Sequence, residues 1–180
     1  MNEVQPIRDP AKIEEIKEYL GAKSKRNRMM FVVGINTGYR IQDMLPLRKR
    51  DVIGEHITLI EMKTGKKKML QINPVLKREL KRYTADMNDD DFLFKSRQGK
   101  NKPIKRDMAY KILREAAEHF GMKDIACHSM RKTFGYMMYQ KTKDITLIRK
   151  LLNHSSDANA FRYIGMDQDM MDAAMNRFGL

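Results

Sequence analysis

Residues 128 to 163 read HSMRKTFGYMMYQKTKDITLIRKLLNHSSDANAFRY, and this stretch decides much of the fold. Its apolar residues recur at helical spacing in two successive groups: Met130, Phe134, Met137 and Met138, then Ile145, Ile148, Leu151 and Leu152. Asp144 precedes the second group, and Ser155-Ser156-Asp157 follows it, so each supplies the side-chain acceptors that begin helices. The stretch therefore predicts short amphipathic helices in succession.

Four side chains of the same stretch could carry chemistry: His128, Arg131, His154 and Tyr163. His128 and Arg131 are three residues apart, so they share a helix face. Two imidazoles, a guanidinium and a phenol on short helices can form an anion-binding site with a nucleophile beside it. Taken singly, each has an ordinary structural interpretation, since a tyrosine in an apolar stretch is more often a core residue than a nucleophile.

The charge of the chain favours a polyanionic partner. The net charge is +13, from 36 basic and 23 acidic residues. Basic residues gather at 23–28, 48–50, 63–68 and 95–106, whereas 164–180 is acidic. Such a surface attracts nucleic acid by long-range Coulomb attraction and counterion release. The alternative is an ordinary soluble protein with solvated lysines.

Length and composition limit the class of protein. The 180 residues suffice for one domain with a full core. No apolar run reaches the roughly 20 residues that a membrane helix needs. Cys127 is the one cysteine, and the four histidines lack close ligand spacing, so we expect no disulfide, no metal and no cofactor. A reducing compartment, the cytoplasm, is expected.

The clearest element outside the opening stretch is a hairpin. The side chains of residues 56–62 follow the two-residue period of a β-strand. Ile57 and Leu59 lie on one face, and the period extends to Glu61. Residues 69–72 form a second short strand, and the basic segment 63–68 between them turns at a glycine. Lys63 could carry a proton to a phosphate or could be one lysine among four. We expect phosphate contacts without sequence preference at the tip from Lys66, Lys67 and Lys68.

The remaining pattern is mostly helical. Asp9-Pro10 has the signature of a helix start, and apolar spacing predicts helices near 76–83, 109–120 and 171–178. Residues 29–35 are almost wholly apolar, and periodicity does not decide between helix and strand there. The predicted fold class is therefore mostly α with a small antiparallel β-sheet (α+β), in one domain.

Arg40 begins a short helix that Pro46 must end. A helix N-terminus favours anions, and an arginine there can bind a phosphate bidentately. Asp43, one turn on, could hold the guanidinium in place. Taken alone, an arginine at such a position is more often an ordinary surface residue.

Together these motifs resemble the tyrosine recombinase (phage integrase) family. The segment Thr37-Gly38-Tyr39-Arg40-Ile41-x-Asp43 resembles its first arginine box, and Lys63-Thr64-Gly65-Lys66 its hairpin lysine motif. His128-x-x-Arg131, then Leu152-x-His154, then Tyr163 resemble its second box. The order is complete and covers the chain from about residue 11, so the resemblance implies the catalytic-domain fold of that family.

The resemblance implies a role for each position. Tyr163 would attack a DNA phosphodiester and form a 3′-phosphotyrosyl link, while Arg40 and Arg131 hold the nonbridging oxygens. Lys63 would protonate the leaving 5′-oxygen. His128 would help to accept the tyrosine proton, and His154 would hydrogen-bond the phosphate. The implied activity is site-specific, metal-independent DNA cleavage and rejoining.

The resemblance also implies partners. We expect double-stranded DNA, with further contacts from Lys100, Lys102 and Lys105, in a bacterial or phage nucleoid. We expect a homo-oligomer, a synaptic tetramer, in which the tail helix of residues 166–180 docks on a neighbouring subunit. The chain would correspond to a single catalytic domain, residues 1–180, without the family's N-terminal DNA-clamping domain.

Three positions depart from the family pattern. Asn153 stands where glycine is usual, Lys132 where histidine is common, and Pro46 interrupts the helix after the first box. Two alternatives stay open at this point. One is a weakly active or inactive DNA-binding relative that modulates a full-length recombinase, and the other is a type IB topoisomerase-like nicking and closing activity.

Overall fold

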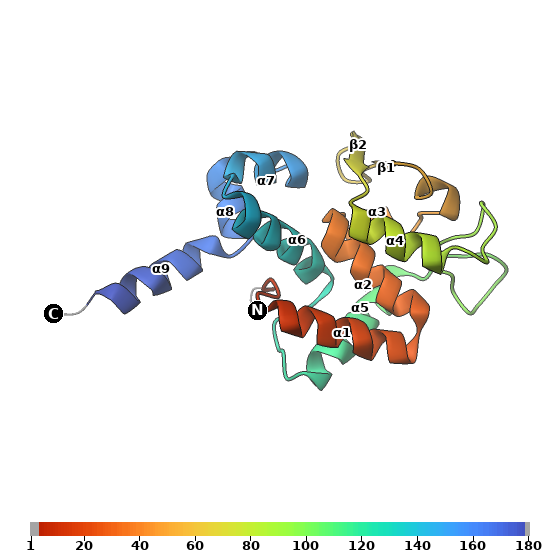
Figure 1. The fold of residues 1–180 in the computed structure, drawn as a ribbon, viewed down its shortest axis with the longest axis horizontal. Coiled ribbons are helices and arrows are strands. Elements are labelled where there is room, and N and C mark those ends of the chain that lie inside the picture. The colour runs from red at the N-terminus through yellow and green to blue at the C-terminus, as the bar shows by residue number, and fades with distance from the viewer. Residues whose placement is uncertain (1–3, 179–180) are drawn as a thin grey trace.

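Helices make up most of the fold, and a two-stranded antiparallel hairpin is the sheet, so the predicted fold class is confirmed. The computed structural model describes residues 4–178 (Figure 1). The elements run in this order: α1 Pro10–Lys23, α2 Lys25–Thr37, α3 Ile41–Met44, η1 Lys49–Asp51 (a single 3-10 turn), β1 His56–Ile60, β2 Lys67–Gln71, α4 Pro74–Tyr83, α5 Arg106–His119, α6 Cys127–Thr142, α7 Ile145–Leu152, α8 Asp157–Tyr163 and α9 Met166–Arg177.

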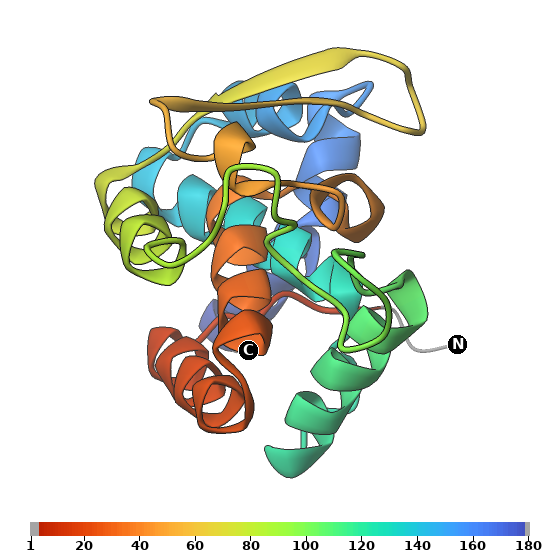
Figure 2. The ribbon, with the colours of Figure 1, turned by 90° about the vertical axis from the view of Figure 1, so that its right-hand side faces the viewer.

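The apolar run at 29–35 is a helix, the centre of α2. Its residues Met29 to Val33 are all buried, because α2 is covered on several sides by α1, α4 and α6. Figure 2 shows α2 through the middle of the molecule, with the hairpin above it and α1 and α5 below. Gly38 ends α2 at φ 61, a left-handed conformation that glycine adopts without strain. Arg40 therefore leaves the core helix at a defined point.

The hairpin differs from the sequence prediction at its second strand. β2 begins at Lys67, two residues before the predicted start, and Leu59 pairs with Lys68 while Ile60 pairs with Lys67. Lys67 and Lys68 therefore belong to the strand and not to the tip. On β1, Ile57 and Leu59 are buried, and Glu61 just beyond the strand is buried with them. The expected two-residue period along this face is confirmed.

The C-terminal third packs as a separate, smaller apolar cluster. Its buried members are Phe134, Ile148, Leu152, Ile164 and Met166, from α6 to α9. Gly135 lets these helices approach, because a Cβ there would lie 2.6 Å from the Ile164 Cγ2 atom. Ser156 and Asp144 cap α8 and α7 as predicted, through bonds to the amides of Asn159 and Leu147. The small cluster supports α8, the helix that carries Tyr163.

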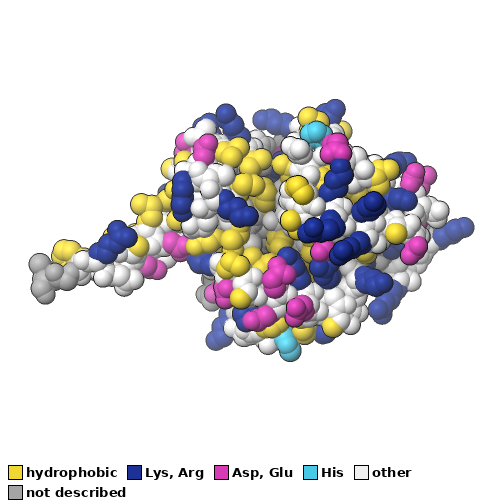
Figure 3. Space-filling view, viewed as in Figure 1, with side chains coloured by type: hydrophobic (Ala, Val, Ile, Leu, Met, Phe, Trp, Pro, Cys, Tyr) yellow, Lys and Arg dark blue, Asp and Glu magenta, His cyan; other side chains and the backbone are white. Residues whose placement is uncertain are grey.

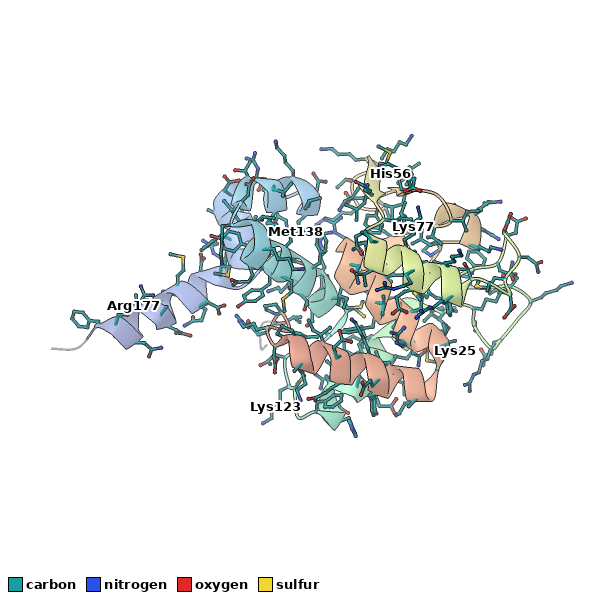
Figure 4. All side chains as sticks on the ribbon, viewed as in Figure 1. Lys25, His56, Lys77, Lys123, Met138 and Arg177 are labelled. Atoms are coloured by element: carbon teal, nitrogen blue, oxygen red, sulfur yellow. The ribbon has the colours of Figure 1, made fainter. Side chains whose placement is uncertain are left out.

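The last helix, α9, leaves the body of the molecule. Figures 1 and 4 show it projecting from the side where Met138 lies, with Arg177 near its far end. Arg8 anchors its first turn through an ion pair of 2.9 Å with Asp169. Beyond this turn its large apolar side chains are exposed: Met170, Met171, Met175 and Phe178. Of the predicted tail, residues 179 and 180 lie outside the described residues.

Basic side chains are prominent on one face of the main body. Figure 3 shows lysine and arginine side chains gathered over the region where Figure 1 places α4, with acidic groups between them. Among the helices that the structure describes, none has the length and apolar character to cross a membrane.

Candidate active site

Arg131 lies at the centre of the site. It is 3% exposed in the second turn of α6, and its Nη1 donates to the Gly38 carbonyl at 2.6 Å. Its Nη2 donates to the Leu152 carbonyl at the end of α7. One guanidinium thus joins the segment before Arg40 to the segment before His154. A planar group with five donors in a fixed geometry is suited to this.

Arg40 lies on the other side of the same space. Arg40, His128 and Arg131 line a cavity of about 50 Å³, together with Arg106 from the start of α5. The Arg40 Nη1 donates to the Glu61 carboxylate at 2.9 Å, whereas Asp43 is 4.0 Å away. The predicted partner Asp43 is therefore the weaker one, and its Oδ1 instead accepts the Met62 amide at 3.0 Å.

Tyr163 ends α8 with its ring against His154, at 4.6 Å between ring centroids. The ammonium of Lys132 lies 5.2 Å from the centroid of the Tyr163 ring. Burial raises the pKa of Tyr163, while the charge of Arg131 and a side-chain hydrogen bond from it act in the opposite direction. A phenol with a raised pKa is a poor nucleophile until a base takes its proton. Tyr163 thus lies beside both an imidazole and a guanidinium.

Both imidazoles are neutral at pH 7. Burial lowers the pKa of His154, and the charges of Arg131 and Arg40 lower it further. Burial also lowers the pKa of His128, as do the charges of Arg106 and Arg131. A neutral imidazole can accept a proton or donate one hydrogen bond. The imidazole in contact with Tyr163 is that of His154.

The turn before His154 has an uncommon backbone. Asn153 adopts φ 52 and ψ 49, a left-handed conformation that asparagine tolerates better than most residues. It closes α7 where the family pattern has glycine, and the His154 amide then bonds back to the Arg149 carbonyl at 3.0 Å. The departure at 153 thus keeps the backbone that glycine would allow.

The structure separates the four hairpin lysines. Lys63, Lys66 and Lys67 are exposed at or beside the tip. Lys68 points inward, donates to the Leu151 carbonyl and lies 5.1 Å from the Tyr39 ring centroid. Burial lowers the pKa of Lys68 to about 8, and the charge of Arg131 contributes. The ammonium that the hairpin places in the site of the free protein is therefore that of Lys68.

The other expected DNA-binding lysines lie elsewhere. Lys100 and Lys102 are exposed on the loop before α5, and Lys105 is exposed at the residue before that helix. The structure does not bring them into the cluster around Arg131. Within residues 4–178, no group of three or more His, Cys, Asp or Glu side chains is arranged to hold a metal ion.

Sequence reasoning missed several residues of the site. Arg106 gave no signal beyond its charge, and Lys132 stood out only as a departure from the family pattern. Lys68 was assigned to the tip because an unbroken lysine run hides the two-residue period. Glu61 did give a signal, since a carboxylate on the buried face of a strand needs partners.

Comparisons with known proteins identify the family of the chain. Residues 9–169 match the phage integrase family. The chain belongs to this family. Its sequence is 48% identical to a probable integrase/recombinase, YoeC, of Bacillus subtilis, over 99% of both chains. It is 28% identical to the tyrosine recombinase XerA of Pyrococcus furiosus, over 93% of this chain and 60% of that one. The resemblance drawn from the motifs is confirmed, together with the enzyme class that it implies.

Solved structures show the same fold. A crystal structure of XerA recombinase superimposes with a TM-score of 0.75 at 18% identity, over 100% of this chain and 68% of that one. The structure of XerH bound to a palindromic difH substrate has a TM-score of 0.71 at 20% identity, over 98% of this chain and 54% of that one. The structure of a lambda integrase tetramer on a Holliday junction has a TM-score of 0.73 at 15% identity, over 91% of this chain and 49% of that one. The chain spans roughly half to two thirds of these longer proteins, whereas it spans nearly all of YoeC.

Proposed function

We propose that this integrase-family protein cleaves and rejoins DNA strands through Tyr163, as a site-specific recombinase. The observation that carries the proposal is the position of Arg131. Its guanidinium lies between the cavity that Arg40 and His128 line and the Tyr163–His154 pair. A phosphate held by the two arginines would therefore lie beside the phenol. Phosphoryl transfer needs positioning and charge stabilisation above all, and guanidinium groups supply both.

The proposed reaction proceeds by an exchange of phosphoester bonds. The Tyr163 oxygen forms a bond to phosphorus, the bond from phosphorus to the 5′-oxygen breaks, and a 3′-phosphotyrosyl link remains. The tyrosine proton goes to a neutral imidazole. The family resemblance assigns the role of proton acceptor to His128, whereas the imidazole in contact with the Tyr163 ring is that of His154. Lys63 at the hairpin tip protonates the 5′-oxygen. Attack by a 5′-hydroxyl reverses the exchange, so rejoining needs no nucleotide cofactor.

Trapping the covalent link tests the proposal. Nicked suicide duplexes, tiled across the DNA that flanks the gene, lose the short cleaved strand and so prevent rejoining. We expect a protein–DNA adduct that survives denaturation, and none with Tyr163→Phe. Anisotropy on the same duplexes shows whether this variant still binds DNA. Binding without any adduct in the wild type would favour a non-catalytic DNA-binding protein.

We propose that DNA follows the basic surface on both sides of the site. The exposed lysines at or beside the hairpin tip and on the segment before α5 support this proposal: Lys63, Lys66, Lys67, Lys100, Lys102 and Lys105. Lysine contacts to phosphate release counterions, so each lost contact lowers the slope of log affinity against log salt by about 1. Alanine substitutions at Lys100 and Lys102 should show this change, without loss of cleavage at saturating DNA.

We propose further that α9 docks on a second copy of the protein in a synaptic tetramer. Four large apolar side chains on and just beyond this helix are exposed, and an apolar helix face outside the core is suited to a partner groove. The similar lambda integrase is a tetramer on a Holliday junction. Ending the chain after Gln168 should leave the fold and half-site binding intact and abolish assembly on paired sites. Unchanged assembly, measured by mass photometry, would contradict the docking.

A further inference from the structure

Glu61 is a buried carboxylate that the proposed reaction leaves without a role. It lies just after β1 and is 2% exposed. Its side chain is on the face of the hairpin nearest Arg40 and Arg131. Its Oε1 accepts the Arg40 Nη1 at 2.9 Å. Its Oε2 accepts the Thr64 hydroxyl at 2.8 Å and the Asn153 side-chain amide at 3.1 Å. Both oxygens are thus engaged.

The three donors come from three separate segments of the site. Arg40 precedes α3, Thr64 follows Lys63 at the hairpin tip, and Asn153 precedes His154 after α7. Each donor is therefore a proposed catalytic residue or the immediate neighbour of one. A single carboxylate joins segments that are 21 and 92 residues away from it in sequence.

The charge of Glu61 matters as much as its hydrogen bonds. Burial by itself would raise the pKa of Glu61, but the hydrogen bonds from Thr64 and Asn153 and the charges of Arg40 and Lys68 outweigh it, and the pKa is lowered. The carboxylate is therefore ionised at neutral pH. Arg40, Arg131 and Lys68 repel one another in the space where the phosphate is to bind. Glu61 offsets this repulsion while no DNA is bound.

Asn153 gives this arrangement a feature particular to the chain. The family pattern has glycine at that position, which has no side chain to reach a carboxylate. Here the left-handed backbone is kept, and the added amide bonds to Glu61. The hairpin is thereby tied to the segment that carries His154.

We propose that Glu61 is a positioning residue for cleavage. Its carboxylate holds one edge of the Arg40 guanidinium, the hairpin tip and the His154 segment in the arrangement that receives the phosphate. The other donors of Arg40 stay available to the nonbridging oxygens. The inference rests on the proposed function, because it assigns Glu61 a part in that reaction.

The test compares Glu61→Gln, Asn153→Gly and the double variant. Glu61→Gln keeps the shape and removes the charge, and Asn153→Gly keeps the backbone and removes the amide. Glu55→Gln is the matched control, since Glu55 is an exposed carboxylate just before β1. The readouts are the single-turnover rate of adduct formation at saturating DNA, the Kd for DNA, and Tm without DNA.

We expect Glu61→Gln to lower the adduct rate about 10- to 100-fold, because a small misplacement of a catalytic group has effects of this size. Its Kd should be unchanged or lower, since one anion near the phosphate is removed. Asn153→Gly alone should lower the adduct rate by less than Glu61→Gln does. Added to Glu61→Gln in the double variant, it should lower the rate no further. Glu55→Gln should match the wild type.

Three results would overturn the inference: an unchanged rate in Glu61→Gln, full additivity of the two substitutions in rate and Tm, or a faster rate with tighter DNA binding. The last would mean that Glu61 competes with the phosphate. If the wild type forms no adduct that depends on Tyr163, the proposed function fails by itself. Non-additive Tm shifts would then still show the Glu61–Asn153 link, without a role in cleavage.

Discussion

The half of the proposed active site that holds the two arginines rests on the main core, whereas the half that holds Tyr163, the proposed nucleophile, rests on a much smaller cluster. Tyr39 and Ile41 flank Arg40, and Met130 precedes Arg131. All three apolar residues are buried in the large core around α2. Tyr163 lies against a cluster with five buried apolar members. Regions with few buried apolar contacts open locally at lower free energy. The arginine half is therefore the fixed part of the proposed site, and the Tyr163 half is the adjustable part.

This difference bears on control of the reaction. Helix α8 is followed at once by α9, which leaves the body and exposes its apolar residues. Docking of α9 on another copy would act on the nucleophile half first. The comparison thus predicts that substitutions in the arginine half abolish cleavage, while substitutions beneath α8 change its rate.

The largest effect is expected at Arg131. Arg131→Lys keeps a positive charge but does not reproduce the fork that reaches both the Gly38 and Leu152 carbonyls. The adduct rate should fall about 100- to 1,000-fold, the usual effect of losing a group that stabilises transition-state charge. Arg114→Lys is the control, at a partly exposed arginine whose Nη1 donates to the Lys123 carbonyl. A rate within a few-fold of the wild type would show that the arginine half is less fixed than its contacts indicate.

A smaller effect is expected from Gly135→Ala, beneath the nucleophile. The new methyl would meet Ile164 at 2.6 Å and Leu152 at 3.0 Å. Overpacking of this kind lowers the free energy of unfolding by about 1–3 kcal/mol. Because Ile164 directly follows α8, we expect the helix to shift in order to relieve the clash. We expect a lower Tm and slower adduct formation with unchanged DNA affinity.

Gly54→Ala is the control for this overpacking, because nothing lies within 4 Å of a Cβ at that position. If Gly135→Ala lowered Tm but left the adduct rate unchanged, the nucleophile half would be stiffer than its small core indicates.

The smallest effect concerns pH and Lys68. Because burial lowers the pKa of Lys68 to about 8, its ammonium is lost as the pH rises through that value. Adduct formation at subsaturating DNA should therefore decline above pH 8, and the decline should move to higher pH in Lys68→Arg. Between pH 8 and the ordinary lysine value of 10.5, the unfolded chain binds this proton more tightly, so stability should rise with pH. A decline that Lys68→Arg leaves in place would assign it to another group.

Much of the fold followed from local pattern. The helices of the C-terminal third and the hairpin have periods and caps that depend on near neighbours in sequence. The segment at 29–35 was undecided because a wholly apolar run has no period, and only its burial by α1, α4 and α6 makes it a helix. The start of β2 was placed late because three successive lysines hide the alternation.

The sequence motifs name the residues of the proposed site, but they do not predict the contacts among them. Spacing along a helix made Asp43 the expected partner of Arg40, yet the closer carboxylate is Glu61, 21 residues away. The same limit applies to Lys63 and Lys68. Their order in the sequence is that of the motif, while the register of the hairpin decides which ammonium points inward.

The most direct test of the account is to identify the linked residue and the DNA end in the trapped adduct. Mass spectrometry of the adduct, after nuclease and protease digestion, reports both. The account predicts a nucleotide joined through its 3′-phosphate to Tyr163. Attachment to Tyr136 or Tyr139 of α6, or a link to a 5′-phosphate, would contradict it.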